Sequence, residues 1–388
     1  MLVADQPVAK IREIRTYVLK HRLSRRLRSA RAWLQNREAL LVEVITEDGV
    51  SGWGEAAGPA AVARAAIEHV LGPKLIGQDA LDIGRHWHAL YNATRESGRR
   101  GVTMSAISAL DIALWDVVGR HLGLPIYTLL GGAFRHRLRA YATGFYFCDD
   151  EDPVQAAVEE AQRYAERGFT AMKIKLGLGP QTDLARVDAV RRVVGDSVLL
   201  LTDASRAYDL PTALRLGRQL QDRGVYWMEE PIAPEDLAGY QQMSEALDMA
   251  IAGGESEQTK YAFAEIVSRR AMDIIQPDTT RAGGITECRK IAALAEAWSV
   301  GYVPHVYGSA IGLAAALQLA AALPDFPASL TPQVSLFELV FEEGRSPLRD
   351  ELATDPVRWA DGLIQVPQGP GLGVEPDREQ MRRFGAGD

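Results

Sequence analysis

Two lysines stand two residues apart within a short apolar run, AMKIK, at residues 171–175. Such a run is typical of a buried strand, in which residues i and i+2 point to the same side. Lys173 and Lys175 would therefore place two ammonium groups on one face. Because lysine is almost never fully buried without a partner, these side chains must face either solvent or anionic groups. The spacing predicts a polar site at this strand.

Other ionisable residues recur along the chain, each at the end of a short apolar run: Asp203, Glu229, Glu255, Asp278, His305 and Glu338. Counted from Lys173, successive members are 23 to 33 residues apart, about the length of one strand and one helix. A single acid after a strand is more often a helix N-cap or a turn residue, and we interpret Glu230 as favouring the N-terminus of the next helix. The recurrence of ionisable groups at one end of successive units indicates an active site.

Three of these carboxylates belong to consecutive units, namely Asp203, Glu229 and Glu255. Carboxylate oxygens are hard ligands that suit Mg²⁺, which keeps open positions for water or substrate. Zinc fits less well, because the set lacks nitrogen and sulfur ligands. The three carboxylates therefore predict a Mg²⁺ site, with the two lysines on one side of it.

Asp278 and His305 are candidates for a dyad on the other side of the metal, in which the carboxylate orients the imidazole and raises its basicity. Two bases beside a divalent ion suit removal of the α-proton of a carboxylate. The resulting enediolate carries a second negative charge, which needs electrostatic stabilisation. For Lys175 to act as a base its pKa must fall, and we expect Lys173 and burial to lower it.

Eight apolar runs, with helical patterns in most of the gaps, make up the chain from about residue 138: 139–144, 171–175, 198–203, 225–230, 249–255, 272–278, 301–305 and 334–339. Repeated strand–helix units imply a parallel sheet, and eight of them favour a closed (β/α)8-type barrel. Chemistry in such barrels lies at the C-terminal ends of the strands, which is where the ionisable residues fall.

The first 135 or so residues have a different pattern, which is typical of an α+β domain. Two apolar runs within 39–56 flank Asp48 and Gly49, which is a hairpin signal. Helical patterns follow at three places: 60–72, 82–96 and 101–122.

The chain of 388 residues has 43 lysine and arginine residues against 51 aspartate and glutamate residues, a net charge of −8. This balance argues against a nucleic-acid partner. Cys148 and Cys288 are too few for a disulfide framework or a cysteine metal site, so we expect a reducing cytoplasm. We expect neither a signal peptide nor a membrane span, and we interpret the alanine-rich stretch 309–324 as a buried helix.

Motifs throughout the chain resemble the mandelate racemase subgroup of the enolase superfamily: GWGEAAGP (52–59), ALWDVVGRHLGLPIYTLLGG (113–132), KIK (173–175), WMEEP (227–231), GGE (253–255), QPD (276–278), GGIT (283–286) and VPH (303–305). The resemblance implies an α/β fold with an α+β capping domain at 1–135 and a (β/α)7β TIM-type barrel at 136–360. A C-terminal segment, 361–388, would return to the cap.

The resemblance also implies roles for individual residues. The three consecutive carboxylates would bind Mg²⁺. Lys175 would be one acid–base group, and His305 with Asp278 the other. Lys173 would contact the substrate carboxylate, and Glu338 would be a donor or partner to that carboxylate if it is protonated.

Four segments are similar to galactarolactone cycloisomerases: 91–101, 139–144, 303–308 and 368–377. The family often has Asn two residues after the first metal ligand, where this chain has Ser205. Loops that would contact substrate also differ, so specificity is not carried over. Tyr141 and Ser205 are expected to bind substrate.

The segment 21–38 is dense in arginine. In the family that this chain resembles, the matching loop closes over the barrel mouth and contacts the distal part of the substrate. Arginine suits bidentate binding of a carboxylate. We therefore expect Arg25 or Arg26 to bind a distal carboxylate, which suggests a dicarboxylate such as an aldarate or tartrate.

These expectations predict an enzyme that acts on a small carboxylate. The first hypothesis is dehydration of an acid sugar or hydroxy-diacid to a 2-oxo acid. Cycloisomerisation of an aldarolactone, or racemisation, would use the same enediolate. A barrel that binds ligand without turnover is a third hypothesis, which the complete set of bases disfavours. The family resemblance also implies a homo-oligomer, from dimer to octamer.

Overall fold

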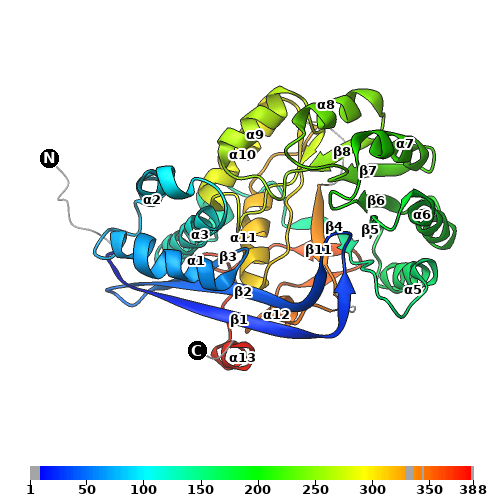
Figure 1. Cartoon of the computed structure of the whole chain (residues 1–388). Coiled ribbons are helices and arrows are strands. Elements are labelled where there is room, and N and C mark those ends of the chain that lie inside the picture. Colours follow the sequence, from blue (N-terminus) through cyan, green and yellow to red (C-terminus); the bar gives the residue numbers. More distant parts are fainter. Residues whose placement is uncertain (1–8, 328–334, 343–344, 386–388) are drawn as a thin grey trace.

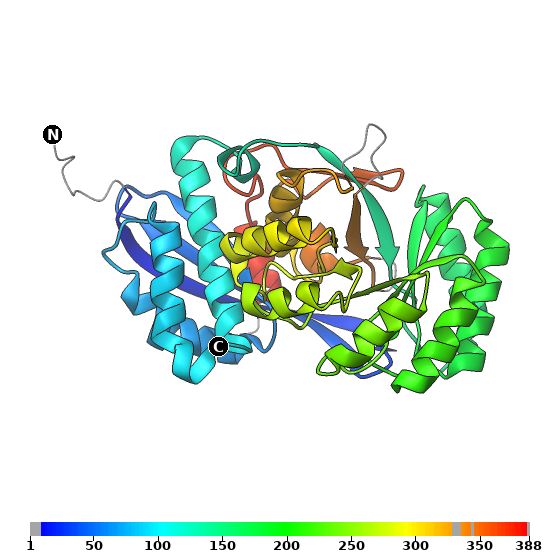
Figure 2. The ribbon, with the colours of Figure 1, turned by 90° about the horizontal axis from the view of Figure 1, so that it is seen from above.

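The computed structural model describes residues 9–327, 335–342 and 345–385. An N-terminal cap lies against a larger barrel of alternating strands and helices (Figure 1). The view from above shows the cap helices, coloured cyan, and the first barrel helices, coloured green, at opposite ends of the molecule (Figure 2). The α/β fold class with a capping domain is confirmed.

Three antiparallel strands form the cap sheet: β1 (Ile11–Arg28), β2 (Trp33–Thr46) and β3 (Ser51–Ala56). The predicted hairpin joins β2 to β3, and Gly49 in its turn has a φ of 88°, which favours glycine. β1 and β2 extend beneath the barrel (Figure 1), where Arg28 pairs with Phe147 of a barrel loop. The segment 21–38, expected to be a loop, is therefore mostly strand.

Three helices complete the cap: α1 (Ala60–Ala66), α2 (Ile83–Gly98) and α3 (Val102–Leu122). α1 and α3 lie on the sheet, and α2 packs against α3. The predicted helix at 60–72 continues after α1 as a π-helical turn at Ile67–Leu71. By length and composition α3 is apolar enough to cross a membrane, but 83% of its most apolar stretch is buried inside the protein. Its hydrophobicity is that of a helix at the core of the cap.

The two glycines of the GWGE motif allow α3 to lie directly on β3. A Cβ atom at Gly54 would lie 1.9 Å from the carbonyl oxygen of Ala109. One at Gly52 would lie 2.4 Å from the amide nitrogen of Val117. Neither position has space for a side chain, so the close approach of helix and strand requires glycine at both.

Eight strands of the barrel coincide with the eight predicted runs: β4 (Arg137–Thr143), β5 (Ala171–Lys175), β6 (Leu199–Asp203), β7 (Val225–Glu229), β8 (Ala250–Gly253), β9 (Ile274–Ile275), β10 (Gly301–Tyr302) and β11 (Leu336–Val340). Neighbours from β4 to β10 pair in sequence order and in parallel, and β11 pairs with β4. The last strand thus lies beside the first. Residue 334, the first of the last predicted run, lies outside the described residues.

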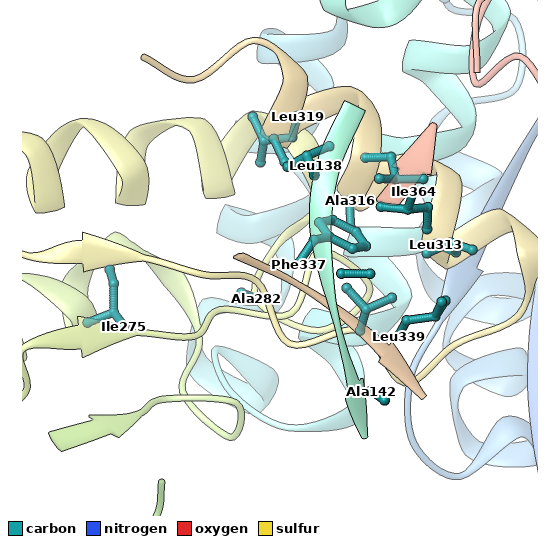
Figure 3. Packing of buried hydrophobic residues seen from close by; sticks show 14 of the residues in the cluster. Leu138, Ala142, Ile275, Ala282, Leu313, Ala316, Leu319, Phe337, Leu339 and Ile364 are labelled. Atoms are coloured by element: carbon teal, nitrogen blue, oxygen red, sulfur yellow. The ribbon is translucent and has the colours of Figure 1, made fainter. Parts of the chain in front are cut away.

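One helix occupies each gap between barrel strands: α5 (Pro153–Glu166), α6 (Pro180–Val194), α7 (Leu210–Gln221), α8 (Leu237–Ala246), α9 (Thr259–Ser268), α10 (Gly284–Ala297) and α11 (Ala310–Ala321). This is the (β/α)7β order. Every residue of α11 is buried. Figure 3 shows Leu313, Ala316 and Leu319 of this helix packed near Leu138 of β4 and Phe337 of β11. The expectation of a buried alanine-rich helix is confirmed.

After β11 the chain forms four short elements: α12 (Pro347–Asp350), β12 (Trp359–Ala360), β13 (Leu363–Gln365) and α13 (Arg378–Phe384). β13 pairs with β4 at the start of the barrel, and α13 packs against β1 of the cap. The indole nitrogen of Trp53 donates to Glu375 at 3.1 Å, and Arg378 forms an ion pair with Glu43. The C-terminal segment therefore contacts both barrel and cap.

Candidate active site

Lys173 and Lys175 face carboxylates inside the barrel. Lys173 is 1% exposed, and its Nζ lies 2.6 Å from Oε1 of Glu229 and 2.8 Å from Oε1 of Glu338. Lys175 Nζ lies 2.8 Å from Oδ2 of Asp203, its direct neighbour across β5 and β6. The alternation of the strand places both ammonium groups on one side. The partner of Lys175 comes from the adjacent strand β6, whereas those of Lys173 come from β7 and β11, each two strands away.

Asp203 and Glu229 are direct neighbours in the register of β6 and β7, so two carboxylates lie side by side. Burial raises the pKa of Glu229 to about 7; Lys173 opposes this shift and Asp203 adds to it. Burial also acts to raise the pKa of Asp203, but the ammonium groups of Lys175 and Lys173 outweigh it and hold that pKa well below its usual range. The charge of Glu229 is thus less well compensated than that of Asp203.

The predicted dyad is present in the structure. His305 Nδ1 lies 2.7 Å from Oδ2 of Asp278, and His305 Nε2 lies 3.3 Å from Oε2 of Glu255. Burial acts to lower the imidazole pKa, but Glu255 and Asp278 outweigh burial and raise it to about 9. Thr280 donates to Asp278 from its backbone nitrogen at 2.8 Å and from its hydroxyl at 2.6 Å, which holds the carboxylate in place.

Glu338 completes the group from β11, on the far side of β4. Its Oε1 accepts from the Thr143 hydroxyl at 3.0 Å, and its Oε2 accepts from the Val306 amide at 2.8 Å. Burial acts to raise its pKa, but Lys173 and His305 outweigh burial and lower it. In this structure Glu338 is therefore ionised and an acceptor, not the protonated donor of the conditional prediction.

The pKa of Lys175 departs from expectation. Burial lowers it and so does Lys173, as predicted, but the adjacent Asp203 carboxylate outweighs both, and the net pKa is raised. The prediction considered the positive charge of Lys173 on the same strand. It omitted the negative charge of Asp203 on the neighbouring strand, which has the larger effect on the pKa of Lys175.

Arg206 is a residue that the sequence analysis missed. Its Nη2 lies 2.5 Å from Oε2 of Glu230, 3.0 Å from Oε1 of Glu255 and 2.6 Å from the Ser256 hydroxyl. The interpretation of Glu230 as a residue of the next helix terminus is wrong, because α8 begins with Asp236 as its N-cap. Burial and the Glu255 charge together raise the pKa of Glu230 to about 8, although Arg206 opposes the shift. The sequence signal that could have identified Arg206 was its position, three residues after the predicted metal ligand Asp203.

The predicted substrate-binding residues take different positions. Ser205 donates to Oδ1 of Asp203 from its amide at 2.7 Å and its hydroxyl at 3.0 Å, so it holds that carboxylate. Tyr141 is fully buried in the barrel interior, with its ring centroid 5.5 Å from Lys173 Nζ and no hydrogen-bond partner for its hydroxyl among the described residues. Arg25 forms an ion pair with Glu151.

Arg26 stacks on Trp33 at 4.4 Å, within the β1–β2 hairpin. The cap arginine that is buried against the barrel is instead Arg37, whose Nε lies 2.9 Å from Oε1 of Glu342. The prediction selected arginines from composition and the family resemblance. Arg25 also reaches the barrel through Glu151 in the loop before α5, but it stays exposed, whereas the fold buries Arg37.

The strand ends gather six carboxylates and four groups that can be positively charged: Asp203, Glu229, Glu230, Glu255, Asp278 and Glu338, with Lys173, Lys175, Arg206 and His305. Arg281 also acts on the Glu255 and Asp278 carboxylates. With these eleven groups ionised, six minus five leaves one negative charge, which a divalent cation would offset. Hard carboxylate donors also suit such an ion. In this conformation the described residues include no group of three or more metal-ligating side chains arranged to hold it. Each of the six carboxylates is within 3.3 Å of a cationic side chain.

Comparison with known proteins agrees with the site. Residues 13–131 match the mandelate racemase / muconate lactonizing enzyme N-terminal domain, and residues 156–380 match the enolase C-terminal domain-like family. The chain belongs to this family, in the enolase superfamily.

Two curated relatives illustrate its chemistry. A D-galactarolactone cycloisomerase of Agrobacterium fabrum is 40% identical over 97% of this chain and 98% of its own length. An arabinonate dehydratase of Saccharolobus solfataricus is 36% identical over 87% of each. Among solved structures, a racemase from Streptomyces coelicolor A3(2) with bound magnesium is 30% identical, with a TM-score of 0.87 over 97% of this chain and 100% of that one. The chain is thus a member of an enzyme family whose relatives here are lyases and isomerases.

Proposed function

We propose that this protein removes the α-proton of an acid sugar and dehydrates it to a 2-oxo acid. The observation that carries the proposal is the placement of two proton-transfer groups in one ring of strand ends. Lys175 comes from β5 and His305 follows β10, and both are nearly buried. Dehydratases among the relatives support this reaction class.

Asp203, Glu229 and Glu255 would hold Mg²⁺, and the net charge of the strand-end group supports that assignment. When bound, the ion supplies positive charge that stabilises the enediolate form of the substrate. Lys173 would bind the substrate carboxylate. The ring also places the anionic Glu338 beside Lys173, which would keep that lysine protonated.

Lys175 and His305 would share the two proton transfers of the reaction. One takes the α-proton, and the other donates a proton to the departing β-hydroxyl group, because elimination needs both an acid and a base. Asp278 would hold the imidazole of His305 in orientation through their 2.7 Å contact. The stereochemistry at the α-carbon decides which of the two acts as the base.

Cycloisomerisation is the second candidate function. It is favoured by the similarity to the galactarolactone cycloisomerase over 97% of this chain. Racemisation would use the same two groups. In all three cases the same side chains act on the α-proton, so the reactions differ in what happens to the enediolate.

We further propose a cytoplasmic enzyme that assembles as an even-numbered homo-oligomer.

The test is incubation of the purified protein with Mg²⁺ and a panel of aldonates, aldarates and their lactones in D₂O. Formation of a 2-oxo acid with loss of water indicates dehydration, and conversion of a lactone to a 2-oxo acid without loss of water indicates cycloisomerisation. Exchange of the α-proton for deuterium without a 2-oxo acid indicates racemisation. We expect Lys175→Ala and His305→Asn each to lower turnover by at least about 100-fold, the contribution of a positioned acid or base.

Lys74→Ala and His88→Asn serve as matched controls, because both residues are exposed in the cap. They should retain wild-type turnover. If Lys175→Ala and His305→Asn both keep full α-proton exchange, the two residues do not carry out the proton transfers, and the proposal fails.

A further inference from the structure

Two tyrosines connect the proposed bases. Tyr146 lies in the loop after β4, and Lys175 Nζ lies 5.1 Å from the centroid of its ring. Tyr307 stands two residues after His305, and the centroids of these two rings are 6.1 Å apart. The hydroxyl groups of Tyr146 and Tyr307 lie 3.4 Å from each other. The pair therefore extends from one proposed base to the other.

The two hydroxyl groups can form hydrogen bonds with a ligand. Both tyrosines are partly exposed, unlike Tyr141 in the barrel interior, which is fully buried. In a contact between two phenols one donates and the other accepts, so one hydroxyl proton stays available. Within the described part of the chain, no other group accepts a hydrogen bond from either hydroxyl. Burial, together with Tyr307 and Glu342, raises the pKa of Tyr146 well above its usual value, so this phenol keeps its proton.

The cap holds Tyr307 in position through Arg37 of β2. Arg37 Nη2 donates to the carbonyl oxygen of Tyr307 at 2.8 Å, and its guanidinium carbon lies 3.4 Å from the centroid of the Tyr307 ring. Its Nε lies 2.9 Å from Oε1 of Glu342, and both of these charged side chains are buried. Tyr307 is therefore held by its backbone and its ring before any substrate binds, which lowers the entropy cost of binding.

We propose that Tyr146 and Tyr307 bind a non-reacting hydroxyl group of a monocarboxylic polyhydroxy acid. This inference rests on the proposed function and adds the substrate class. A pair of phenols can both donate to and accept from a neutral hydroxyl. A second carboxylate would need an unpaired cation, whereas Arg37 is already committed to Glu342. The buried Glu342 carboxylate would also repel it.

The test is a double cycle on the enzyme with Mg²⁺. Wild type, Tyr146→Phe and Tyr307→Phe are each assayed with the aldonate that wild type converts fastest, and with analogues that lack one hydroxyl beyond C3. We expect each phenylalanine variant to lose about 10- to 100-fold in kcat/KM on the intact aldonate, the effect of removing a hydrogen bond in a closed site. For one analogue, the kcat/KM values of wild type and variants should differ by less than about 3-fold. That analogue already lacks the hydroxyl group that the tyrosines bind.

Tyr226→Phe is the matched control, because Tyr226 is a partly buried tyrosine near the opposite ends of the strands, and it should behave as wild type with every substrate. The variants keep their rings, and circular dichroism with thermal unfolding verifies folding. An equal loss on the intact aldonate and on all analogues would show a structural role and overturn the inference. A preference of wild type for aldarates would also overturn the inference. In both cases the proposed function survives. Absence of any α-proton exchange in wild type would overturn both.

Discussion

At the scale of residues, the candidate site is a network of buried charges in which carboxylates outnumber cations. Glu229 and Glu230 have pKa values raised to about 7 and about 8, because burial and neighbouring carboxylates penalise their charged forms. Arg206, absent from the sequence-based prediction, relieves part of this repulsion at Glu230 and Glu255. A divalent cation would relieve the remainder, which makes metal binding a testable property of the folded chain apart from catalysis.

We expect addition of Mg²⁺ to the chelator-treated protein to raise its unfolding temperature by a few degrees. A ligand at 100 times its Kd adds about 2.7 kcal/mol to the stability of a folded protein. Thermal unfolding followed by fluorescence measures the shift. Asp203→Asn and Glu255→Gln should each abolish most of it, whereas Glu166→Gln, an exposed acid of α5, should leave it intact. A full shift in both site variants would contradict the ligand assignment.

At the scale of elements, glycines set how closely the cap helix α3 approaches its sheet. The absence of a side chain at Gly54 lets the β3 backbone contact α3 at Ala109. This contact places the next residue of the motif, Glu55, at the N-terminus of α11. Glu55 accepts from the Ser309 amide at 2.9 Å and the Gly312 amide at 2.8 Å. The motif therefore links the cap to the helix that follows the His305 strand.

We expect Gly54→Ala to destabilise the protein strongly, because its Cβ would lie 1.9 Å from a backbone oxygen that has no freedom to move without shifting α3. Overpacking of this kind costs about 1–3 kcal/mol or more. Gly84→Ala is the matched control: no atom lies within 4 Å of the added Cβ, and the position is within helix α2. It should be neutral or stabilising by up to about 1 kcal/mol. Chemical denaturation compares the two, and equal stabilities would refute the packing argument.

At the scale of the whole molecule, buried carboxylates of α3 connect the cap to the barrel and to the C-terminal segment. Asp111 of α3 accepts from the Thr286 amide at 2.9 Å near the start of α10. Asp116 accepts from Trp53 of the cap at 2.8 Å and from Leu372 of the C-terminal segment at 2.7 Å. Amides at helix N-termini favour acceptors with negative charge. Burial nonetheless raises the pKa of Asp111 to about 7, so this contact depends on pH.

The raised pKa of Asp111 gives a definite sign to the pH dependence. Between its usual pKa near 4 and about 7, the folded protein binds a proton at Asp111 that the unfolded chain does not. This group therefore makes the folded state less stable as pH rises through that range. The effect is on the order of 2–4 kcal/mol. Asp111→Asn should flatten this part of the profile.

The difference in unfolding temperature between wild type and Asp111→Asn, measured from pH 5 to pH 8, isolates the contribution of this group. We expect the unfolding temperature of the variant to rise relative to that of wild type as pH rises. Asp188→Asn is the control, a partly exposed acid paired with Arg223. A constant difference between wild type and Asp111→Asn across this range would show that Asp111 does not titrate there.

Much of the architecture follows from local patterns in the sequence. The eight apolar runs became the eight barrel strands, because strand formation and the parallel order depend on short hydrophobic segments separated by helices. Lys175, Asp203 and Glu229 end their strands, Glu255, Asp278 and His305 follow theirs, and Lys173 and Glu338 lie two residues before the ends of β5 and β11. Position along a strand decides position along the barrel axis, so these side chains gather near one end of the barrel. Lys173 and Lys175 share a face for the same local reason.

The tertiary structure alone decided which charges meet. Asp203 rather than Lys173 dominates the pKa of Lys175, because the register of neighbouring strands places the carboxylate opposite it. Composition and the family resemblance favoured Arg25 and Arg26, whereas the fold buries Arg37 against the barrel. Sequence determines the identity and spacing of the groups at the strand ends. Distances between strands that are remote in sequence determine their pairing, and electrostatic energy depends on those distances.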